Sequence, residues 1–236
     1  MHTYLEVLNN PSNCTLDNSQ FFPNNISAGT RSASHQMNSV TDRYLVHFPT
    51  SISGIRCYTD ASTEPDSTIS TSRQVGLGIF IINTNIQPPM SVFIKTTMQE
   101  SYSVIMAESA AMALVSDILN QLQCRNTTIL SDNQQLVYFL NGVNLSNPPD
   151  WRIKPFTQFT ANLLSGTSSQ VHRIKRNQNQ MADSLAKQTL QALTTNQPAY
   201  TGTCTNSSHG NNDCPVLRAI NDVTINSVMV LSASCC

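Results

Sequence analysis

The order of strand-like and helix-like segments constrains the fold of this chain more than any other sequence feature. Three apolar, strand-like runs come first, and the segments between them contain the turn-forming residues of hairpin connections. These runs are IRCYTDAS (55–62), VGLGIFIIN (75–83) and SVFIKT (91–96). Consecutive strands joined by hairpins pair antiparallel, so the first half of the domain is predicted to be a three-stranded antiparallel sheet.

The hydrophobic period then changes from strand-like to helical. Residues 101–123 have the apolar repeat of a long helix, and short buried strands and helices alternate after it. The later predicted strands are 127–130 and 169–175, and the later predicted helices are 131–142, 148–166 and 178–193. This succession indicates an α/β fold whose sheet has an antiparallel half and a parallel half.

These segments divide the chain into three parts. Residues 1–52 are polar and aperiodic and are interpreted as a linker or a weakly ordered arm. Residues 53–194 form the predicted domain, and residues 195–236 are interpreted as an irregular tail that contains cysteines. The ending SVMVLSASCC (227–236) is apolar enough to pack as an added strand.

Charge is scarce and unevenly distributed. Only 11% of the 236 residues are charged, against about 25% in average proteins. The net charge of −1 gives no overall basic field, but residues 151–187 contain six basic residues and one acid. No leader-like or membrane-spanning run is evident, so the protein is expected to be intracellular, in the nucleus or cytoplasm, with reduced cysteines and no membrane contact.

Two acids occupy positions for which local structure gives little reason. Asp60 lies inside the first strand-like run, where aspartate is disfavoured, although Pro65 leaves open that it ends the strand. Glu108 is the only charged residue on an apolar helix face formed by positions 104, 108, 111, 115, 118 and 122. A carboxylate on that face must be neutralised, paired or bound to a cation, unless its head group reaches solvent at the boundary.

Two further acids have ordinary local explanations as well as functional ones. Asp132 follows the strand at 127–130, and the carboxyl ends of parallel strands are where α/β sheets place their sites. With Gln135 it could instead form a capping box. Asp183 opens the last helix, where a carboxylate favourably complements the helix dipole.

The four acids together point to metal chemistry. Asp60, Glu108, Asp132 and Asp183 are expected to converge at one edge of the sheet, where their charges repel one another unless cations lie between them. Hard carboxylate oxygens suit Mg²⁺ or Mn²⁺. Two such ions, about 3.5–4 Å apart, form the clamp that enzymes use for in-line phosphoryl displacement.

Four motifs, in this order and spacing, resemble those of the ribonuclease H type 1 domain. They are CYTDAS (57–62), MAESAAMALV (106–115), LSDNQQLVYFLN (130–141) and KRNQNQMADSLA (175–186). The resemblance runs from Gly54 to Leu193 and is closest to the plant reverse-transcriptase-like branch, which often derives from retroelements.

The resemblance implies a five-stranded mixed sheet flanked by helices. It also implies a monomeric, metal-dependent endonuclease that hydrolyses the RNA strand of RNA/DNA hybrids with two Mg²⁺ or Mn²⁺ ions. The catalytic and metal-binding tetrad of that family falls on Asp60, Glu108, Asp132 and Asp183. The alternative is a non-catalytic, nucleic-acid-binding remnant of a retroelement ribonuclease H domain.

Nucleic acid is expected to contact the basic segment before the last helix. The residues predicted to do so are Arg173, Lys175, Arg176 and Asn179. Two features depart from the family pattern. The segment 141–150 contains no basic residue, which would weaken phosphate binding, and His172 falls within a strand instead of the loop where many members have a histidine. His172 is therefore interpreted as an ordinary strand residue.

The tail has one pattern that could hold a metal. Cys204, His209 and Cys214 have the spacing C-x4-H-x4-C, which suggests zinc. Only three ligands are evident, and the C-x2-C pairs of structural zinc sites are absent, so chance is the favoured interpretation from sequence.

Overall fold

We describe residues 54–63, 73–84, 90–142, 147–194, 201–204 and 214–235 of the computed structural model. The predicted arm at 1–52 lies outside these residues. In the described part of the chain, no helix is both long and apolar enough to span a membrane.

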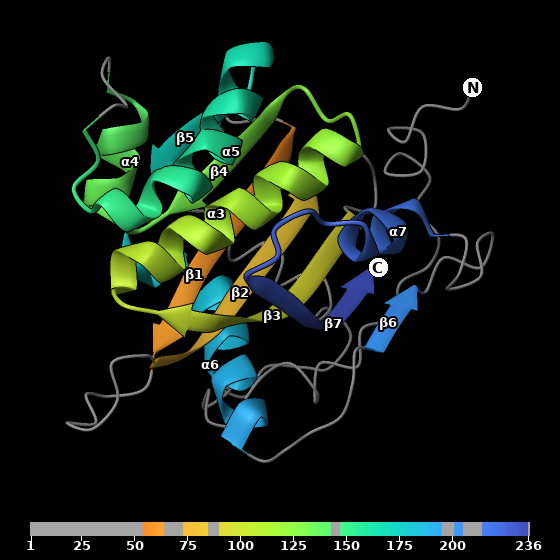
Figure 1. Ribbon diagram of the computed structural model, residues 1–236. Helices are drawn as coiled ribbons and strands as arrows, with labels where there is room; N and C mark the ends of the chain where they lie inside the picture. Colours follow the sequence, from red (N-terminus) through yellow and green to blue (C-terminus); the bar gives the residue numbers. More distant parts are fainter. Residues whose placement is uncertain are drawn as a thin grey trace, which may run out of the picture.

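A mixed sheet of seven strands forms the centre of the molecule (Figure 1), in the order β5-β4-β1-β2-β3-β7-β6. The strands are β1 Ile55–Thr63, β2 Arg73–Asn83, β3 Met90–Ser101, β4 Thr127–Ser131, β5 Gln170–Arg173, β6 Thr201–Cys204 and β7 Val228–Cys235. β1, β2 and β3 pair antiparallel, as predicted, and β4 and β5 continue the sheet in parallel from β1.

Helices cover both faces of this sheet. They are α3 Val104–Gln121, α4 Gln134–Leu140, α5 Lys154–Gly166, α6 Gln180–Thr194 and α7 Pro215–Asn221, with short 3₁₀ turns η2 Trp151–Ile153 and η3 Arg176–Gln178. α3 lies across one face together with α4, α5 and α7, whereas α6 lies on the other (Figure 1). The larger core joins α3 to the sheet, and a smaller core around Tyr58, Phe80 and Leu185 joins α6 to it.

Two glycines of β2 let α6 approach the sheet unusually closely. A Cβ atom on Gly76 or Gly78 would lie less than 3.0 Å from backbone atoms of α6, including the carbonyl oxygens of Ala186 and Ala182. Only glycine tolerates this separation between a strand and a helix. Because Gly78 pairs with Asp60 across β1 and β2, the close approach holds the start of α6 beside Asp60.

The tail differs from its sequence-based interpretation. Residues 195–236 were expected to be irregular, yet they contain β6, α7 and β7. β7 pairs antiparallel with β3 and parallel with β6, so the sheet has seven strands and not the five that the resemblance implies. The prediction that the apolar ending packs as an added strand is confirmed by β7.

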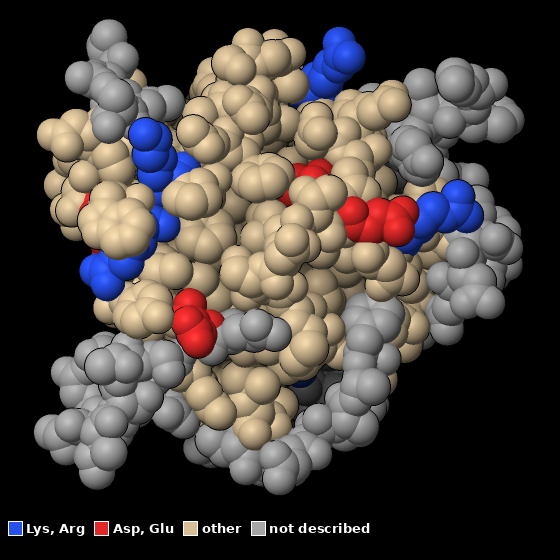
Figure 2. Space-filling model, viewed as in Figure 1, with Lys and Arg blue, Asp and Glu red and all other residues tan. Residues whose placement is uncertain are grey.

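Hydrogen bonds from the segment after α7 attach it to α3. The buried carboxylate of Asp117 accepts hydrogen bonds from the backbone and the hydroxyl of Thr224, at 2.7 and 2.9 Å. Gln121 donates from its side chain to the carbonyl oxygen of Asp222. Figure 2 shows that charged side chains are few on the α3 face of the molecule, which is mostly uncharged.

Candidate active site

Three of the four predicted acids lie together at the carboxyl end of β4. One oxygen each from Asp60, Glu108 and Asp132 lies within 4.8 Å of the other two. Asp60 comes from β1, Glu108 from the second turn of α3, and Asp132 from the bend that follows β4. Asp60 and Glu108 are each 5% exposed, and Asp132 is half-buried. The apolar stripe of α3 therefore turns Glu108 towards the sheet and away from bulk water.

Asp60 and Glu108 cannot both ionise easily in this place. Burial, and next the charge of Asp132, raises the pKa of Asp60 from 3.8 to about 7. Burial and then the charge of Asp60 hold the pKa of Glu108 well above its ordinary value. Glu108 also has a buried carboxylate oxygen, Oε2, without a hydrogen-bond partner among the described residues. A cluster of this kind fits a divalent cation, which would favour the ionised form of all three groups.

Asp183 lies near this cluster but is not part of it. It stands in the first turn of α6, and its charge contributes to the raised pKa of Asp60. One of its oxygens, Oδ2, accepts a hydrogen bond of 2.6 Å from Lys187, and the other lies 3.9 Å from Arg176. The structure thus brings three of the predicted tetrad together and pairs the fourth with cations.

Asp132 does not form the capping box that its spacing from Gln135 suggested. The residue that caps α4 is Asn133, whose side-chain oxygen accepts a 3.0 Å hydrogen bond from the backbone of Leu136. Helix capping therefore does not account for Asp132. Its carboxylate lies beside those of Asp60 and Glu108 instead.

Asn179 occupies a different place from the one that sequence suggested. It was predicted to contact nucleic acid, but it is fully buried. Its amide donates hydrogen bonds to the carbonyl oxygen of Thr59, at 2.9 Å, and to Asp132, at 3.4 Å. The backbone carbonyl oxygen of Asn179 accepts a hydrogen bond of 3.0 Å from the backbone N–H of Asp183. Asn179 therefore ties together the backbone before Asp60, the Asp132 carboxylate and the start of α6.

The three basic residues predicted to contact nucleic acid are exposed beside the acids. Arg173 ends β5 and pairs with Ser131, the residue before Asp132, while Lys175 and Arg176 follow in the next turn. The positive charge of Arg176 lowers the pKa of Glu108 and so partly offsets the increase that burial causes. Solvent-facing cations thus border the acidic cluster. His172 is also exposed, and it makes a 2.8 Å hydrogen bond with Gln170 of the same strand.

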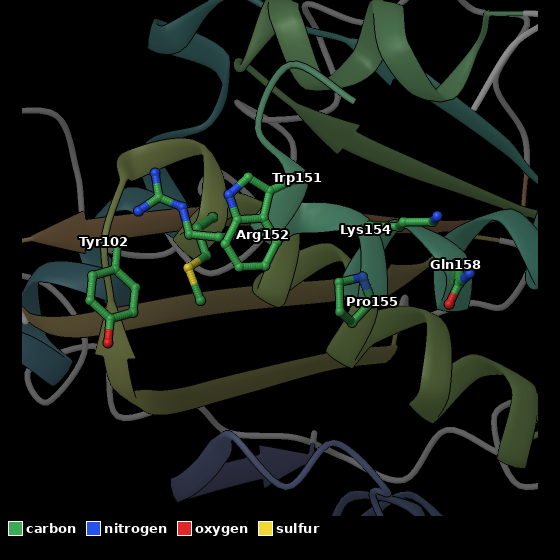
Figure 3. A pocket seen from close by; sticks show the side chains of 7 residues that line it. Tyr102, Trp151, Arg152, Lys154, Pro155 and Gln158 are labelled. Atoms are coloured by element: carbon green, nitrogen blue, oxygen red, sulfur yellow. The ribbon is translucent and has the colours of Figure 1, made fainter. Parts of the chain in front are cut away.

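A surface hollow that the sequence did not predict lies at the start of α3. It has a volume of about 760 Å³, and none of the four acids lines it. Tyr102, Trp151, Arg152 and Lys154 surround it (Figure 3), and Trp151 is 79% exposed. The available sequence signal was the segment PDWRIK, in which Trp151 is followed by Arg152 and Lys154.

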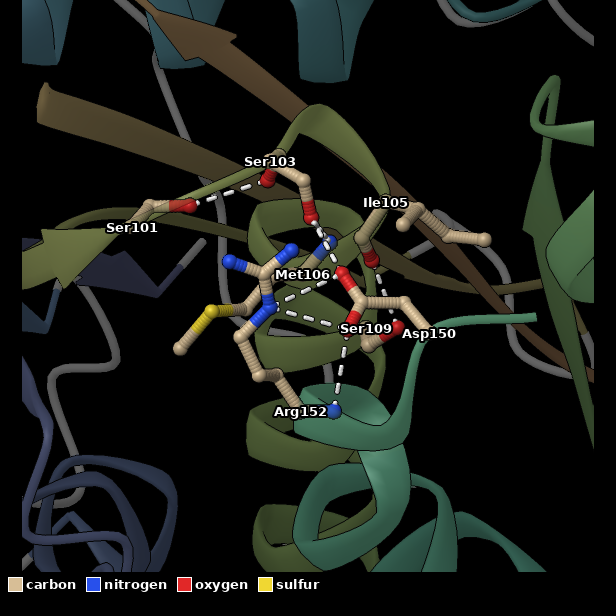
Figure 4. Close-up of polar contacts among 7 residues, drawn as sticks. All are labelled: Ser101, Ser103, Ile105, Met106, Ser109, Asp150 and Arg152. Atoms are coloured by element: carbon tan, nitrogen blue, oxygen red, sulfur yellow. Dashed lines mark hydrogen bonds and ion pairs between the residues drawn. The ribbon is translucent and has the colours of Figure 1, made fainter. Parts of the chain in front are cut away.

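Asp150 fixes one wall of this hollow to α3 (Figure 4). Its carboxylate accepts hydrogen bonds from the backbone and the guanidinium of Arg152 and from the hydroxyl of Ser103. Ser103 in turn caps α3 through the backbone of Met106. The bond from Arg152 is the main cause that holds the pKa of Asp150 below its ordinary value. Arg152 also lies over the ring of Tyr102, 5.5 Å from its centroid.

A family model described as reverse transcriptase-like matches residues 64–189, more than half of the chain. The chain belongs to the reverse transcriptase-like family. The match includes Glu108, Asp132 and Asp183 and begins four residues after Asp60. The matched residues run from the segment before β2 into α6, and so include most of the mixed sheet and of the helices that cover it.

Solved structures similar to this reverse transcriptase-like protein include ribonuclease H domains of low sequence identity. The ribonuclease H1 of the archaeon Halobacterium salinarum is 16% identical, with a TM-score of 0.47, and the match covers 58% of this chain and 97% of that one. The N-terminal ribonuclease H domain of a Mycobacterium tuberculosis protein is 15% identical, with a TM-score of 0.49, and the match covers 60% of this chain and 96% of that one. The prototype foamy virus ribonuclease H domain is 19% identical, with a TM-score of 0.48, and the match covers 59% of this chain and 95% of that one. No curated protein matches the chain.

Proposed function

We propose that this chain is a metal-dependent endonuclease that hydrolyses the RNA strand of RNA/DNA hybrids. The observation that carries the proposal is the buried group of Asp60, Glu108 and Asp132, with an unpartnered carboxylate oxygen on Glu108 among the described residues. Membership of the reverse transcriptase-like family supports it. We also infer, from the four sequence motifs, descent from the plant retroelement branch.

Asp60, Glu108 and Asp132 would hold Mg²⁺ or Mn²⁺, since their oxygens are the hard ligands that these ions prefer. When bound, a pair of such ions activates the attacking water and stabilises the leaving oxygen. Asp183 would join the other acids if it exchanged its bond with Lys187 for the metal. Asn179 would keep Asp60 and Asp132 in place by its bonds to Thr59 and Asp132.

Substrate phosphates would lie against the exposed cations. Arg173, Lys175 and Arg176 border the acids, and phosphate contacts by such residues supply most of the affinity for nucleic acid. The hollow lined by Tyr102, Trp151 and Arg152 offers a second surface, because an exposed aromatic ring beside a cation suits a nucleic-acid strand.

The second candidate function is a non-catalytic, nucleic-acid-binding domain of retroelement origin. Two observations favour it. Asp183 pairs with Lys187 and Arg176 and stands apart from the other three acids. The segment 141–150 also lacks the basic residues that would strengthen hybrid binding.

A paired cleavage and binding experiment separates the two functions. Purified protein is incubated with a labelled RNA/DNA hybrid and Mg²⁺, and cleavage products are resolved while binding is measured in EDTA. We expect cleavage of the RNA strand only, and its loss in the Glu108→Gln variant, with binding retained. Binding without cleavage in the wild-type protein would establish the non-catalytic alternative, and cleavage by Glu108→Gln at the wild-type rate would refute the assignment of the acids.

A further inference from the structure

Three cysteines that are distant in the sequence meet at the opposite edge of the sheet from β5. The sulfur atoms of Cys204, Cys214 and Cys235 lie within 4.8 Å of one another. Sequence spacing had grouped Cys204 and Cys214 with His209, which lies outside the described residues. Cys235 was not expected in this group, because only the pairing of β6 with β7 brings it there, directly beside Cys204.

Each cysteine belongs to a different element of the tail. Cys204 ends β6, Cys214 precedes α7 as its N-cap, and Cys235 ends β7. Cys214 and Cys235 are buried, and Cys204 is half-buried against them. In the structure all three are thiols. The cluster therefore lies where the three elements of the tail meet.

Apolar packing gives β6 little support. It is a strand of four residues, TGTC, at the end of the sheet, and its side chains alternate between exposed and half-buried. Its neighbour in the sheet is β7. A strand so short and so exposed gains little from burial, and a cross-link at its end would hold it in place.

We propose that Cys204, Cys214 and Cys235 bind one Zn²⁺ ion that joins β6, α7 and β7. Thiolates are the ligands that zinc prefers in structural sites, and around a tetrahedral ion with Zn–S bonds of about 2.3 Å the sulfurs lie about 3.8 Å apart. The separations in the structure need only a small contraction to reach this geometry. Binding releases the three thiol protons to solvent, and a water molecule completes the tetrahedron.

The competing explanation is that the cysteines are small apolar residues of the core. Buried thiols often have that role. Cys57 and Cys124 are of this kind, since both are buried within the main core and neither belongs to the cluster. Cys204 differs from them because it is only half-buried, and its sulfur approaches two others from separate elements. Packing alone does not require that convergence.

The first test uses the wild-type protein, kept reduced and with Mg²⁺ in excess so that hard-metal sites are filled. Protein is titrated with Co²⁺, whose thiolate charge-transfer absorption reports sulfur ligands and is silent for carboxylates. We expect about one equivalent to bind with that absorption, and Zn²⁺ to displace it and raise Tm. The absence of the absorption would overturn the proposal.

Matched variants then assign the ligands. Cys204→Ser, on the half-buried position, should lose the charge-transfer absorption and the rise of Tm with Zn²⁺. Cys124→Ser removes a buried thiol outside the cluster and should retain both. Circular dichroism of each variant without zinc checks that it is folded. A folded Cys204→Ser protein that binds Co²⁺ as the wild type does would refute the site, and hybrid cleavage by Cys204→Ser should be unchanged.

Discussion

At the scale of single residues, Asp60 and Glu108 are held close together inside the protein, where burial raises the pKa of both carboxyl groups and the charge of Asp60 further disfavours ionisation of Glu108. An aspartate whose pKa is about 7 in the folded protein and 3.8 when unfolded is easier to ionise in the unfolded chain. Asp60 therefore lowers the free energy of unfolding progressively as pH rises from about 4 to 7, and this loss of stability persists above that range. A bound divalent cation reverses this effect, because it favours the ionised form.

Asp60→Asn should consequently separate stability from activity. Without divalent metal, Tm of the wild-type protein should fall between pH 4 and pH 7, and the variant should show a smaller fall because it lacks the ionising group. With Mg²⁺, hybrid cleavage by the variant should decrease by orders of magnitude. Thermal melts and cleavage rates measure the two effects. The exposed Asp222→Asn is the control, and a variant that cleaves like the wild type would contradict the metal site.

Asn179→Ala tests the residue that joins Asp60, Asp132 and α6. The substitution leaves the buried carbonyl oxygen of Thr59 without its donor, which costs about 1–3 kcal/mol of unfolding free energy. Because Asp132 loses a partner as well, a higher Mg²⁺ concentration should be needed for half-maximal cleavage. Urea denaturation and a Mg²⁺ titration measure these changes. Unchanged values for both would show that Asn179 does not position the acids.

Arg176→Ala tests the proposed phosphate contact. The side chain is 81% exposed, and its 3.9 Å separation from Asp183 is worth little to stability, so Tm should change little. Affinity for an RNA/DNA hybrid should fall similarly for different sequences, and the dependence of log K on log salt should become shallower by about 1. Arg218→Ala removes an equally positive, exposed residue from α7 and serves as the control. Equal salt slopes for Arg176→Ala and wild type would refute the contact.

Sequence identified some of these residues better than others. Glu108 was predictable because a single charge on an apolar helix face is a local pattern, and the structure buries it as that pattern requires. The pairing of Asp183 with Lys187 and the burial of Asn179 were not, because they depend on how α6 and the turn before it meet β1 and β4. Functional roles for the acids remain predictions.

At the scale of elements, the contact between α6 and β2 depends on two glycines. The side chain of Gly78→Ala would meet backbone atoms of Ala182 and Ala186, which cannot move aside without shifting the helix. We expect a loss of at least about 1–3 kcal/mol in unfolding free energy and a loss of cleavage, since α6 carries Asp183. Denaturation curves and cleavage rates measure both effects.

Gly166→Ala is the matched control for this contact. Gly166 ends α5, and nothing lies within 4 Å of the position that its Cβ would occupy. The substitution should be neutral or slightly stabilising. If Gly78→Ala were as stable as Gly166→Ala, the close approach of α6 would not be a constraint on the fold.

The strands and helices of residues 55–194 were largely predictable, because each has a clear hydrophobic period or a turn signal at its ends. The elements of the tail were harder to predict. β6 has four residues and no apolar alternation, so nothing local marks it as a strand. It becomes one only through its pairing with β7, which in turn needs the edge of β3.

At the scale of the whole molecule, β7 covers the edge of β3 and α7 adds apolar residues to the main core. Removal of residues 195–236 should therefore lower Tm and promote self-association, because an uncovered strand edge and apolar surface attract other chains. Thermal melts and sedimentation velocity, compared with the full chain at equal concentration, measure this outcome. A shortened protein that stays monomeric with an unchanged Tm would show that the tail is dispensable for stability.

The position of β7 has a consequence for the rate at which the chain folds. β1, β2 and β3 are neighbours in sequence and can pair after closing short loops, whereas Val92 of β3 must find Cys235 of β7 across most of the domain. Pairings of such long sequence separation cost chain entropy before they gain contact energy, and proteins rich in them fold in milliseconds to seconds rather than microseconds. The outer part of the sheet is therefore expected to assemble late, on an antiparallel sheet that has already formed.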